Sequence, residues 1–136
     1  MELKRGRNSV YRIGYHVVWC TKYRKPVLVA GIADAVKRLL FKIAVDGGFF
    51  IENLKIMPDH IHSFLSASPN HLAADMVKAL KGVSARFLFK EYPELKNRLW
   101  GGHLWNPSYY IGTVGSISED AVKKYIESQK AGRQDE

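Results

Sequence analysis

The sequence predicts an α+β domain in which helices cover a single antiparallel sheet. Stretches with an apolar period of two and stretches with helical spacing alternate as strand, helix, strand, strand, helix, strand, and a last helix follows. A tight Pro-Asp turn joins the two middle strands, so these strands pair as a hairpin. The chain has 136 residues, 46% of them hydrophobic and 25% charged, which is typical of one globular domain.

The first strand and the first helix are predicted from periodicity. Between residues 10 and 21, Tyr, Ile, Val and Trp alternate with Arg, Gly and His, which is the pattern of a half-buried strand. Between about residues 28 and 46, apolar side chains recur at helical spacing. Gly47 and Gly48 then supply the left-handed conformation at which helices commonly end.

The hairpin occupies the centre of the chain. Residues 49–57 are apolar and β-prone, Pro58-Asp59 makes the turn, and residues 60–67 resume as a strand. Ser68-Pro69-Asn70 then carries side chains of the kind that cap helices, so a second helix should begin there. Its apolar stripe continues to Pro93.

The last strand and the last helix complete the domain. Residues 104–115 predict a fourth strand that Pro107 interrupts near its start. Ser116 with Glu119 forms a capping box and opens a helix that ends near Lys130. The order βαββαβ is that of the split βαβ, ferredoxin-like folds. Their two crossover helices cover one face of the sheet and leave the other face open.

Two histidines on the second hairpin strand are candidate metal ligands. Side chains alternate along a strand, so His60 and His62 project to the same face about 6.6 Å apart, and Ile61 takes the opposite face. Two imidazoles at this spacing can share one metal ion. The alternative is that both are half-exposed strand residues that hydrogen-bond to neighbours. Asp59 could orient an imidazole, or serve only the turn.

The last helix carries polar groups on its apolar stripe. Val122, Tyr125, Ile126 and Gln129 occupy positions i, i+3, i+4 and i+7. A phenol and an amide oxygen about 6 Å apart along the axis can serve one site as nucleophile and ligand. Alternatively, Tyr125 is an ordinary residue of an amphipathic helix and Gln129 reaches water near the helix end.

Composition restricts the partner and the compartment. The formal net charge of +8 and the pI of about 9.6 favour an anionic partner, most commonly nucleic acid. Cys20 is the single cysteine, so no disulfide forms within the chain. The charged N-terminus lacks a signal-peptide core, and no apolar run reaches the roughly 20 residues that cross a bilayer. We therefore expect a cytoplasmic protein without membrane partners.

Several spaced motifs together resemble one family. They are MPDHIHSFL, LWNPSYYIGTVG, the Tyr and Gln of KKYIESQ, and KALKGVSARFLF in the second helix. In order and spacing they are similar to those of the single-tyrosine HUH transposases (TnpA-type) of bacterial and archaeal insertion sequences. The resemblance runs from about Tyr11 to Gln129, so residues 1–136 would form one HUH transposase domain, with a basic N-terminal arm at 1–8 and a flexible tail at 131–136.

The resemblance implies a site and a reaction. By similarity, Tyr125 on the extra C-terminal helix is the nucleophile, and His60, His62 and Gln129 ligate Mg²⁺ or Mn²⁺. The enzyme would cleave and rejoin single-stranded DNA with hairpins at the element ends, through a 5′-phosphotyrosine intermediate. Family members act as homodimers whose active sites are shared between subunits.

Basic and aromatic residues are candidate DNA contacts. An ordinary solvated charge is an alternative for each basic residue, and a core position is the alternative for Trp105, Tyr109 and Tyr110, which could stack bases. The basic candidates are Arg5, Arg7, Lys22, Arg24, Lys78, Lys81 and Arg86.

Three other classes of protein share some of these features. An HUH replication initiator or relaxase would share the histidine pair and the tyrosine, but usually adds a third histidine ligand and further domains. A non-catalytic RRM-like module would share fold and charge, yet its aromatic RNP1 strand is missing. A 2H phosphoesterase needs two H-x-T/S motifs, and only HIHS approaches one. His16 has no motif partner and is expected to be structural or exposed.

Overall fold

A four-stranded antiparallel sheet forms the centre of the computed structural model, which describes residues 3–6, 10–11, 13–113 and 119–129. The strand order is β4-β5-β3-β6, and each neighbouring pair is antiparallel. The strands are β3 (Ile13–Cys20), β4 (Phe50–Met57), β5 (His60–Ala67) and β6 (Tyr110–Thr113). This order confirms the predicted ferredoxin-like α+β fold.

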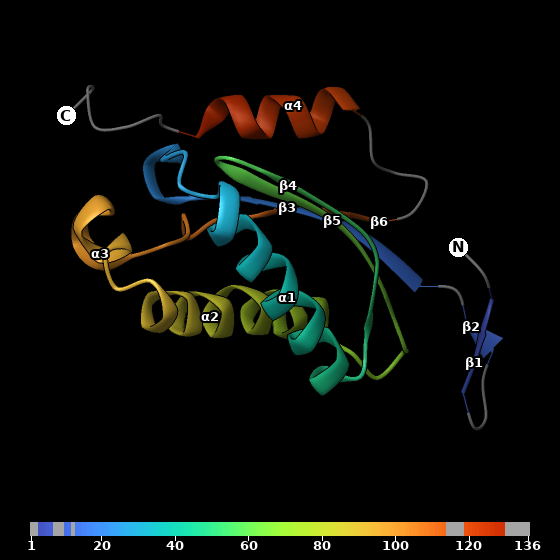
Figure 1. Ribbon diagram of the computed structural model, residues 1–136. Coiled ribbons are helices and arrows are strands. Elements are labelled where there is room, and N and C mark those ends of the chain that lie inside the picture. The colour runs from blue at the N-terminus through green and yellow to red at the C-terminus, as the bar shows by residue number, and fades with distance from the viewer. Residues whose placement is uncertain (1–2, 7–9, 12, 114–118, 130–136) are drawn as a thin grey trace.

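Helices lie on both faces of the sheet (Figure 1). The crossover helices α1 (Ala30–Gly47) and α2 (Ala73–Glu91) cover one face, as predicted. Helix α4 (Glu119–Ser128) lies over the other face and contacts β3. The face that the crossover helices leave open is therefore partly covered by the last helix.

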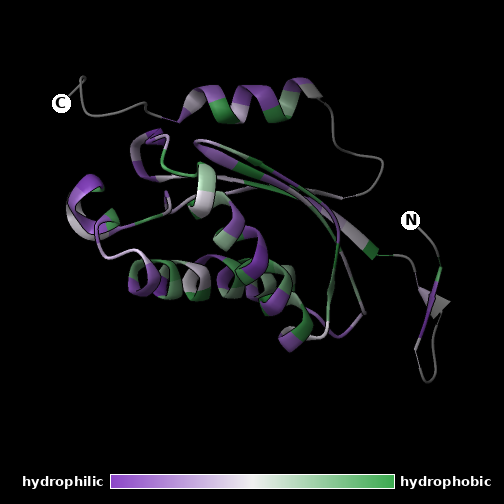
Figure 2. Cartoon of the chain, in the orientation of Figure 1, coloured by the Kyte–Doolittle hydropathy of each residue, from purple (hydrophilic) through white to green (hydrophobic). Residues whose placement is uncertain are grey.

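The hydrophobic core lies between the sheet and the crossover helices. Val17 and Ile61 on the strands and Leu40 on α1 are fully buried there, because alternate strand residues and one helical stripe are apolar. Hydrophobic and hydrophilic residues alternate along α1 and α2 (Figure 2), as expected of helices with one side in the core. Helix α1 ends where predicted, because Gly48 adopts the left-handed conformation with φ of 75°.

Helix α2 begins later than predicted. Its N-cap position is Leu72, which makes no side-chain capping hydrogen bond. The predicted capping residue Ser68 instead shares a 2.8 Å hydrogen bond with Nδ1 of His71 and accepts one from the backbone N–H of Asn70. The hydroxyl therefore stabilises the loop before the helix, and the prediction of a cap at 68–70 was wrong.

The fourth strand is shorter than predicted. Regular pairing in β6 covers only residues 110–113, and Trp105 forms an isolated bridge with Thr21. Pro107 has no N–H to donate, and the side chain of Asn106 accepts the N–H of Ser108 at 3.0 Å, so this segment folds as a local turn. A short helix, α3 (Leu95–Arg98), and a 3-10 turn, Trp100–Gly102, precede it and were not predicted.

The N-terminal region adds a small second sheet. Strands β1 (Lys4–Arg5) and β2 (Val10–Tyr11) pair with each other, so part of the predicted basic arm and the start of the predicted first strand form a short antiparallel ladder. The capping serine at 116 and the predicted tail at 131–136 lie outside the described residues.

Candidate active site

The predicted histidine pair lies on β5, on the sheet face that is turned away from α1 and α2. Ile61 and Leu65 are fully buried in the core, whereas His60 and His62 are only partly buried. The alternation predicted for this strand is therefore confirmed, and both imidazoles project to one face. Helix α4 covers part of the same face (Figure 1).

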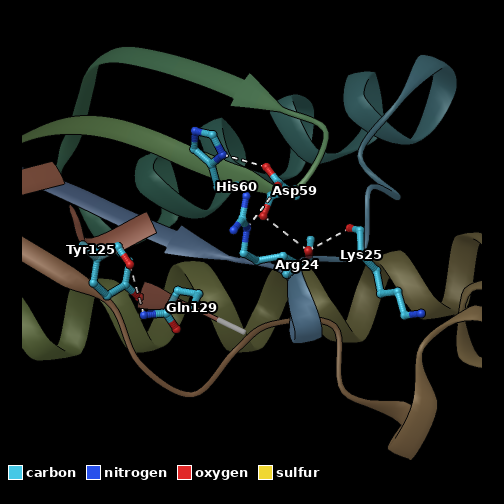
Figure 3. Close-up of polar contacts among 7 residues, drawn as sticks. Arg24, Lys25, Asp59, His60, Tyr125 and Gln129 are labelled. Carbon is cyan, nitrogen blue, oxygen red and sulfur yellow. Dashed lines mark hydrogen bonds and ion pairs between the residues drawn. The ribbon is translucent and has the colours of Figure 1, made fainter. Parts of the chain in front are cut away.

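Asp59 holds the first imidazole. Its carboxylate lies 2.8 Å from Nδ1 of His60 and also accepts a hydrogen bond from Nε of Arg24 at 3.2 Å (Figure 3). The backbone N–H of Thr21 donates to the carbonyl of Asp59, which ties the turn to the end of β3. Because Nδ1 is engaged by Asp59, Nε2 is the nitrogen that His60 can offer to a ligand.

The second imidazole has another histidine beside it. The His16 ring lies edge-on to the His62 ring with centroids 5.7 Å apart. Burial lowers the pKa of His62, and charges on His16, His60 and Lys55 lower it further. Burial also lowers the pKa of His16. Both rings therefore favour the neutral form, and neutral imidazole is the form that binds metal ions.

Tyr125 and Gln129 meet at one hydroxyl group. The Oγ of Ser108 lies 2.9 Å from the phenol oxygen of Tyr125 and donates to Oε1 of Gln129 at 3.3 Å. The Gln129 amide also donates to the backbone carbonyl of Tyr125 (Figure 3). Burial raises the pKa of the Tyr125 phenol, and the hydrogen bond with Ser108 partly opposes this effect. The structure thus brings together the two residues predicted on the last helix.

Ser108 is itself held by two residues that the sequence did not connect with Tyr125. Its backbone N–H donates to Oδ1 of Asn106 at 3.0 Å, and its hydroxyl oxygen lies 3.1 Å from the same atom. The Lys81 ammonium donates to the carbonyls of Asn106, Pro107 and Ser108 at 2.7, 3.3 and 3.0 Å. Burial lowers the pKa of Lys81 to about 8. The only signal in the sequence was that Asn106, Ser108 and Lys81 fall within the family-like motifs.

The two halves of the predicted site come from different elements. Within the described chain, no hydrogen bond joins Tyr125 or Gln129 to either histidine, and Figure 3 draws none between His60 and these two residues. The described residues also contain no group of three or more His, Cys, Asp or Glu side chains that could hold a metal ion. Two imidazoles on one face and an amide oxygen nonetheless fit a divalent cation that keeps open positions for a phosphate.

The basic candidates have different surroundings. Arg24 is paired with Asp59, and Lys81 is bound to three carbonyls. Lys22 lies over the ring of Tyr23, with Nζ 5.1 Å from the centroid. The other described candidates are the exposed Arg5, Lys78 and Arg86, and Arg7 lies outside the described residues.

The aromatic candidates also differ in their surroundings. Trp105 is buried, and its indole N–H donates to Oγ of Ser84 at 3.1 Å, so it belongs to the core. Tyr109 is partly buried against the core, and Tyr110 packs beside Tyr125 with ring centroids 6.1 Å apart. None of the described helices is long and apolar enough to cross a membrane.

The sequence is similar to known transposases over nearly its whole length. Residues 9–129 match the family described as "Transposase IS200 like". The chain is 51% identical over 129 residues to the ISDra2 transposase TnpA of Deinococcus radiodurans, a match that covers 95% of this chain and 92% of that relative. It is 29% identical over 123 residues to the transposase for insertion sequence element IS200 of Salmonella typhimurium, covering 88% of this chain and 81% of that one.

Solved structures agree with this result. A crystal structure of a Deinococcus radiodurans protein described as a transposase has a TM-score of 0.87 and 46% identity, and the match covers 95% of this chain and 99% of that one. A REP-associated tyrosine transposase bound to a REP hairpin shares the fold, with a TM-score of 0.55 and 12% identity over 93% of this chain and 70% of that one. With the family matched over residues 9–129 and a relative at 51% identity, this chain belongs to the IS200-like transposase family.

Proposed function

We propose that this transposase cleaves and rejoins single-stranded DNA at the ends of an insertion sequence, with Tyr125 as the nucleophile. The observation that carries the proposal is the pairing of Tyr125 with Gln129 at Ser108, on a helix that covers the face bearing His60 and His62. A phenol nucleophile, together with an amide oxygen and two imidazoles that can hold a divalent cation, suits a metal-assisted transesterification.

The reaction is a balanced exchange of esters. The Tyr125 oxygen loses its proton and attacks the phosphorus, so a bond forms between the phenol oxygen and the phosphorus while the bond to the 3′ oxygen breaks. The 3′ oxygen takes up a proton and leaves as a hydroxyl, and the 5′ phosphate stays on Tyr125. A second 3′-hydroxyl reverses these steps and rejoins the strand, so no nucleotide cofactor is consumed.

His60, His62 and Gln129 are the residues that would hold Mg²⁺ or Mn²⁺, and such a cation would withdraw negative charge from the phosphodiester. Asp59 orients the His60 ring for this purpose through its contact with Nδ1. Burial keeps His62 neutral and therefore able to donate a nitrogen lone pair. Ser108 keeps the phenol and the amide of the last helix on the same side.

The proposal includes hairpin DNA and a homodimer. One relative of this fold is bound to a REP hairpin, and the net charge of +8 suits a nucleic acid. Tyr125 and the histidines lie on separate elements without a mutual hydrogen bond in the described chain, so the last helix can serve the histidine pair of either subunit. We propose that the two active sites are shared between subunits.

The first test is covalent attachment. An oligonucleotide from either end of the element should form an adduct with the wild-type chain that survives denaturing electrophoresis, and Tyr125→Phe should abolish the adduct while single-strand binding changes less than about twofold, because only the attacking oxygen is removed. Tyr92→Phe, on the far side of the sheet, is the matched control and should attach normally. An adduct formed by the Tyr125→Phe variant would show that another residue is the nucleophile.

The second test concerns the sharing of sites. Tyr125→Phe and His62→Ala chains should each be inactive, and mixing them equally under conditions that allow subunit exchange should restore about a quarter of the wild-type adduct. Random exchange makes about half of the dimers heterodimers, and one of the two hybrid sites in each heterodimer has both intact groups. Equal mixing of two Tyr125→Phe preparations is the control. Heterodimers that form but stay inactive would assign both groups to the same subunit.

A further inference from the structure

A pocket lies beside the histidine pair on the open face of the sheet. Its volume is about 220 Å³, and three strands contribute to it. The lining residues are His16, Asn53, Lys55, His62, Ser63 and Phe64. The family resemblance assigns a role only to His62 among these residues, so the remainder of the pocket has no function yet.

A β-bulge in β4 places polar side chains in this pocket. Ile51 pairs with Leu65, but Asn53 rather than Glu52 pairs with Phe64, so one extra residue is accommodated between them. Without the bulge, Leu54 would face His62. With it, Asn53 lies opposite Phe64 and Lys55 opposite His62, on the same face of the sheet. Bulges often re-aim side chains near functional sites.

Aromatic rings form the other side of the pocket. The His16 ring stacks on Phe64 with centroids 4.7 Å apart and an interplanar angle of 30°. Within the described chain, Nδ1 of His16 is buried and has no hydrogen-bond partner. An apolar side chain would stack equally well without this penalty, so stability alone does not account for an imidazole at this position.

Asn53 and Lys55 are exposed at the rim, and neither forms a hydrogen bond or ion pair with another side chain of the described chain. Their neighbours on β4 behave differently: Glu52 binds Ser66 and Lys4, and Leu54 packs against the core. The amide and the ammonium are therefore available to a ligand. A free-phosphate site would gather several cationic or N–H donors, whereas this pocket combines stacked rings with one amide and one cation.

We propose that this pocket binds one nucleobase of the single-stranded DNA, next to the phosphodiester that is cleaved at the histidine pair. The His16 and Phe64 rings provide the stacking surface, the Asn53 amide donates to and accepts from the base edge, and Lys55 contacts an adjoining phosphate. This inference rests on the proposed function and adds to it a base-reading subsite and the residues that form it.

The test combines abasic DNA with pocket variants. The cleavage position is first mapped with the wild-type chain, and a single abasic nucleotide is then moved through the three positions on each side of it. Binding is measured by fluorescence anisotropy in the Tyr125→Phe background, so that no covalent product forms. One abasic position should weaken binding about five- to a hundredfold, which is the effect of losing one stacked base.

The diagnostic result is non-additivity. With His16→Ala added, the same abasic substitution should weaken binding less than about threefold, because the stacking contact is already lost. Asn53→Ala removes only the hydrogen bonds to the base edge and should reduce the abasic penalty by a smaller factor. Asn53 is exposed, so its variant should fold normally, and Lys37→Ala on α1 is the matched control that should keep the full abasic penalty.

Two results would overturn the assignment, and they are distinguishable. If the wild-type chain forms the covalent adduct but the abasic profile is unchanged in both pocket variants, the pocket does not bind a base, while the proposed function stands. If the wild-type chain forms no adduct with either element end, the proposed function fails and this subsite fails with it.

Discussion

At His60, one contact determines which ring nitrogen is available. Asp59 lies 2.8 Å from Nδ1 and is itself held by Arg24, so the carboxylate cannot easily turn away. Tyr23 and Arg24 adopt positive φ of 56° and 52° in the loop that delivers this guanidinium. Such strained backbone persists only where surrounding contacts maintain it, and it is frequent at functional sites.

The first prediction at this scale concerns Asp59→Asn. The amide can still approach His60 but carries no negative charge, so it orients the ring less firmly. We expect the Mg²⁺ or Mn²⁺ concentration for half-maximal DNA cleavage to rise about tenfold or more, which is typical when the partner of a metal-binding histidine is lost. Titration of cleavage and calorimetry of Mn²⁺ binding would measure the change.

Asp46→Asn, an exposed carboxylate on α1, is the matched control and should leave the metal titration unchanged. Equal midpoints for Asp59→Asn and the wild-type chain would mean that Asp59 serves only the turn, which is the alternative that the sequence left open.

At the scale of elements, the docking of α4 can be followed through Cys20. This thiol lies in β3, the strand that α4 contacts, and it is fully buried. Burial, followed by the charge on Asp59, raises its pKa to about 11. At pH 8 the thiolate fraction is then on the order of a hundredfold below that of a free cysteine, and access to reagent is also blocked.

Val122→Asp should undock α4 and expose the Cys20 thiol to reagent. Val122 is a buried residue of α4, and a carboxylate there is costly without a partner. We expect Cys20 to react at least tenfold faster with a thiol reagent at pH 8, while circular dichroism shows that the sheet and the crossover helices remain folded. Lys124→Asp, exposed on the same helix, is the control. An unchanged labelling rate would indicate that α4 does not cover Cys20.

The same elements explain what the sequence could predict. The faces of strand β5 were predicted because Ile61 alternates with His60 and His62, and the end of α1 was predicted because Gly48 follows a regular apolar stripe. The start of α2 and the length of β6 were missed because Ser68 and Asn106 use their side chains in local turns. Such competition between hydrogen bonds is decided only by the folded loop.

The candidate site also has a part that the sequence predicted and a part that it could not predict. Spacing along one element paired His60 with His62 and Tyr125 with Gln129. The approach of His16 to His62 depends on the register between two strands, and that of Ser108 to Tyr125 depends on how α4 docks. Neither follows from periodicity. His16 was expected to be structural or exposed, and the structure shows it partly buried beside the candidate ligand His62.

At the scale of the whole molecule, the net charge of +8 is distributed between paired and available cations. Arg24, Arg38 and Lys42 form ion pairs, and Lys81 is bound to carbonyls. Paired cations of this kind contribute to the overall electrostatic potential of the protein but make few new contacts with phosphate. Lys22 differs from these residues, because its ammonium lies over the ring of Tyr23 just after the end of β3. The end of β3 pairs with the start of β5, so Lys22 follows the strand end that lies beside His60.

The last prediction therefore tests whether Lys22 contacts a phosphate directly or only adds to the net positive charge of the protein. Each contact with single-stranded DNA releases counterions and contributes about 0.7 to the slope of log affinity against log salt. Lys22→Ala should lower that slope by about 0.7, whereas Lys37→Ala, which removes the same charge from the exposed side of α1, should leave it unchanged. Anisotropy titrations of Tyr125→Phe chains at four salt concentrations would measure both slopes. If both substitutions lowered the slope equally, the DNA would respond to net charge alone, and Lys22 would be an ordinary solvated cation.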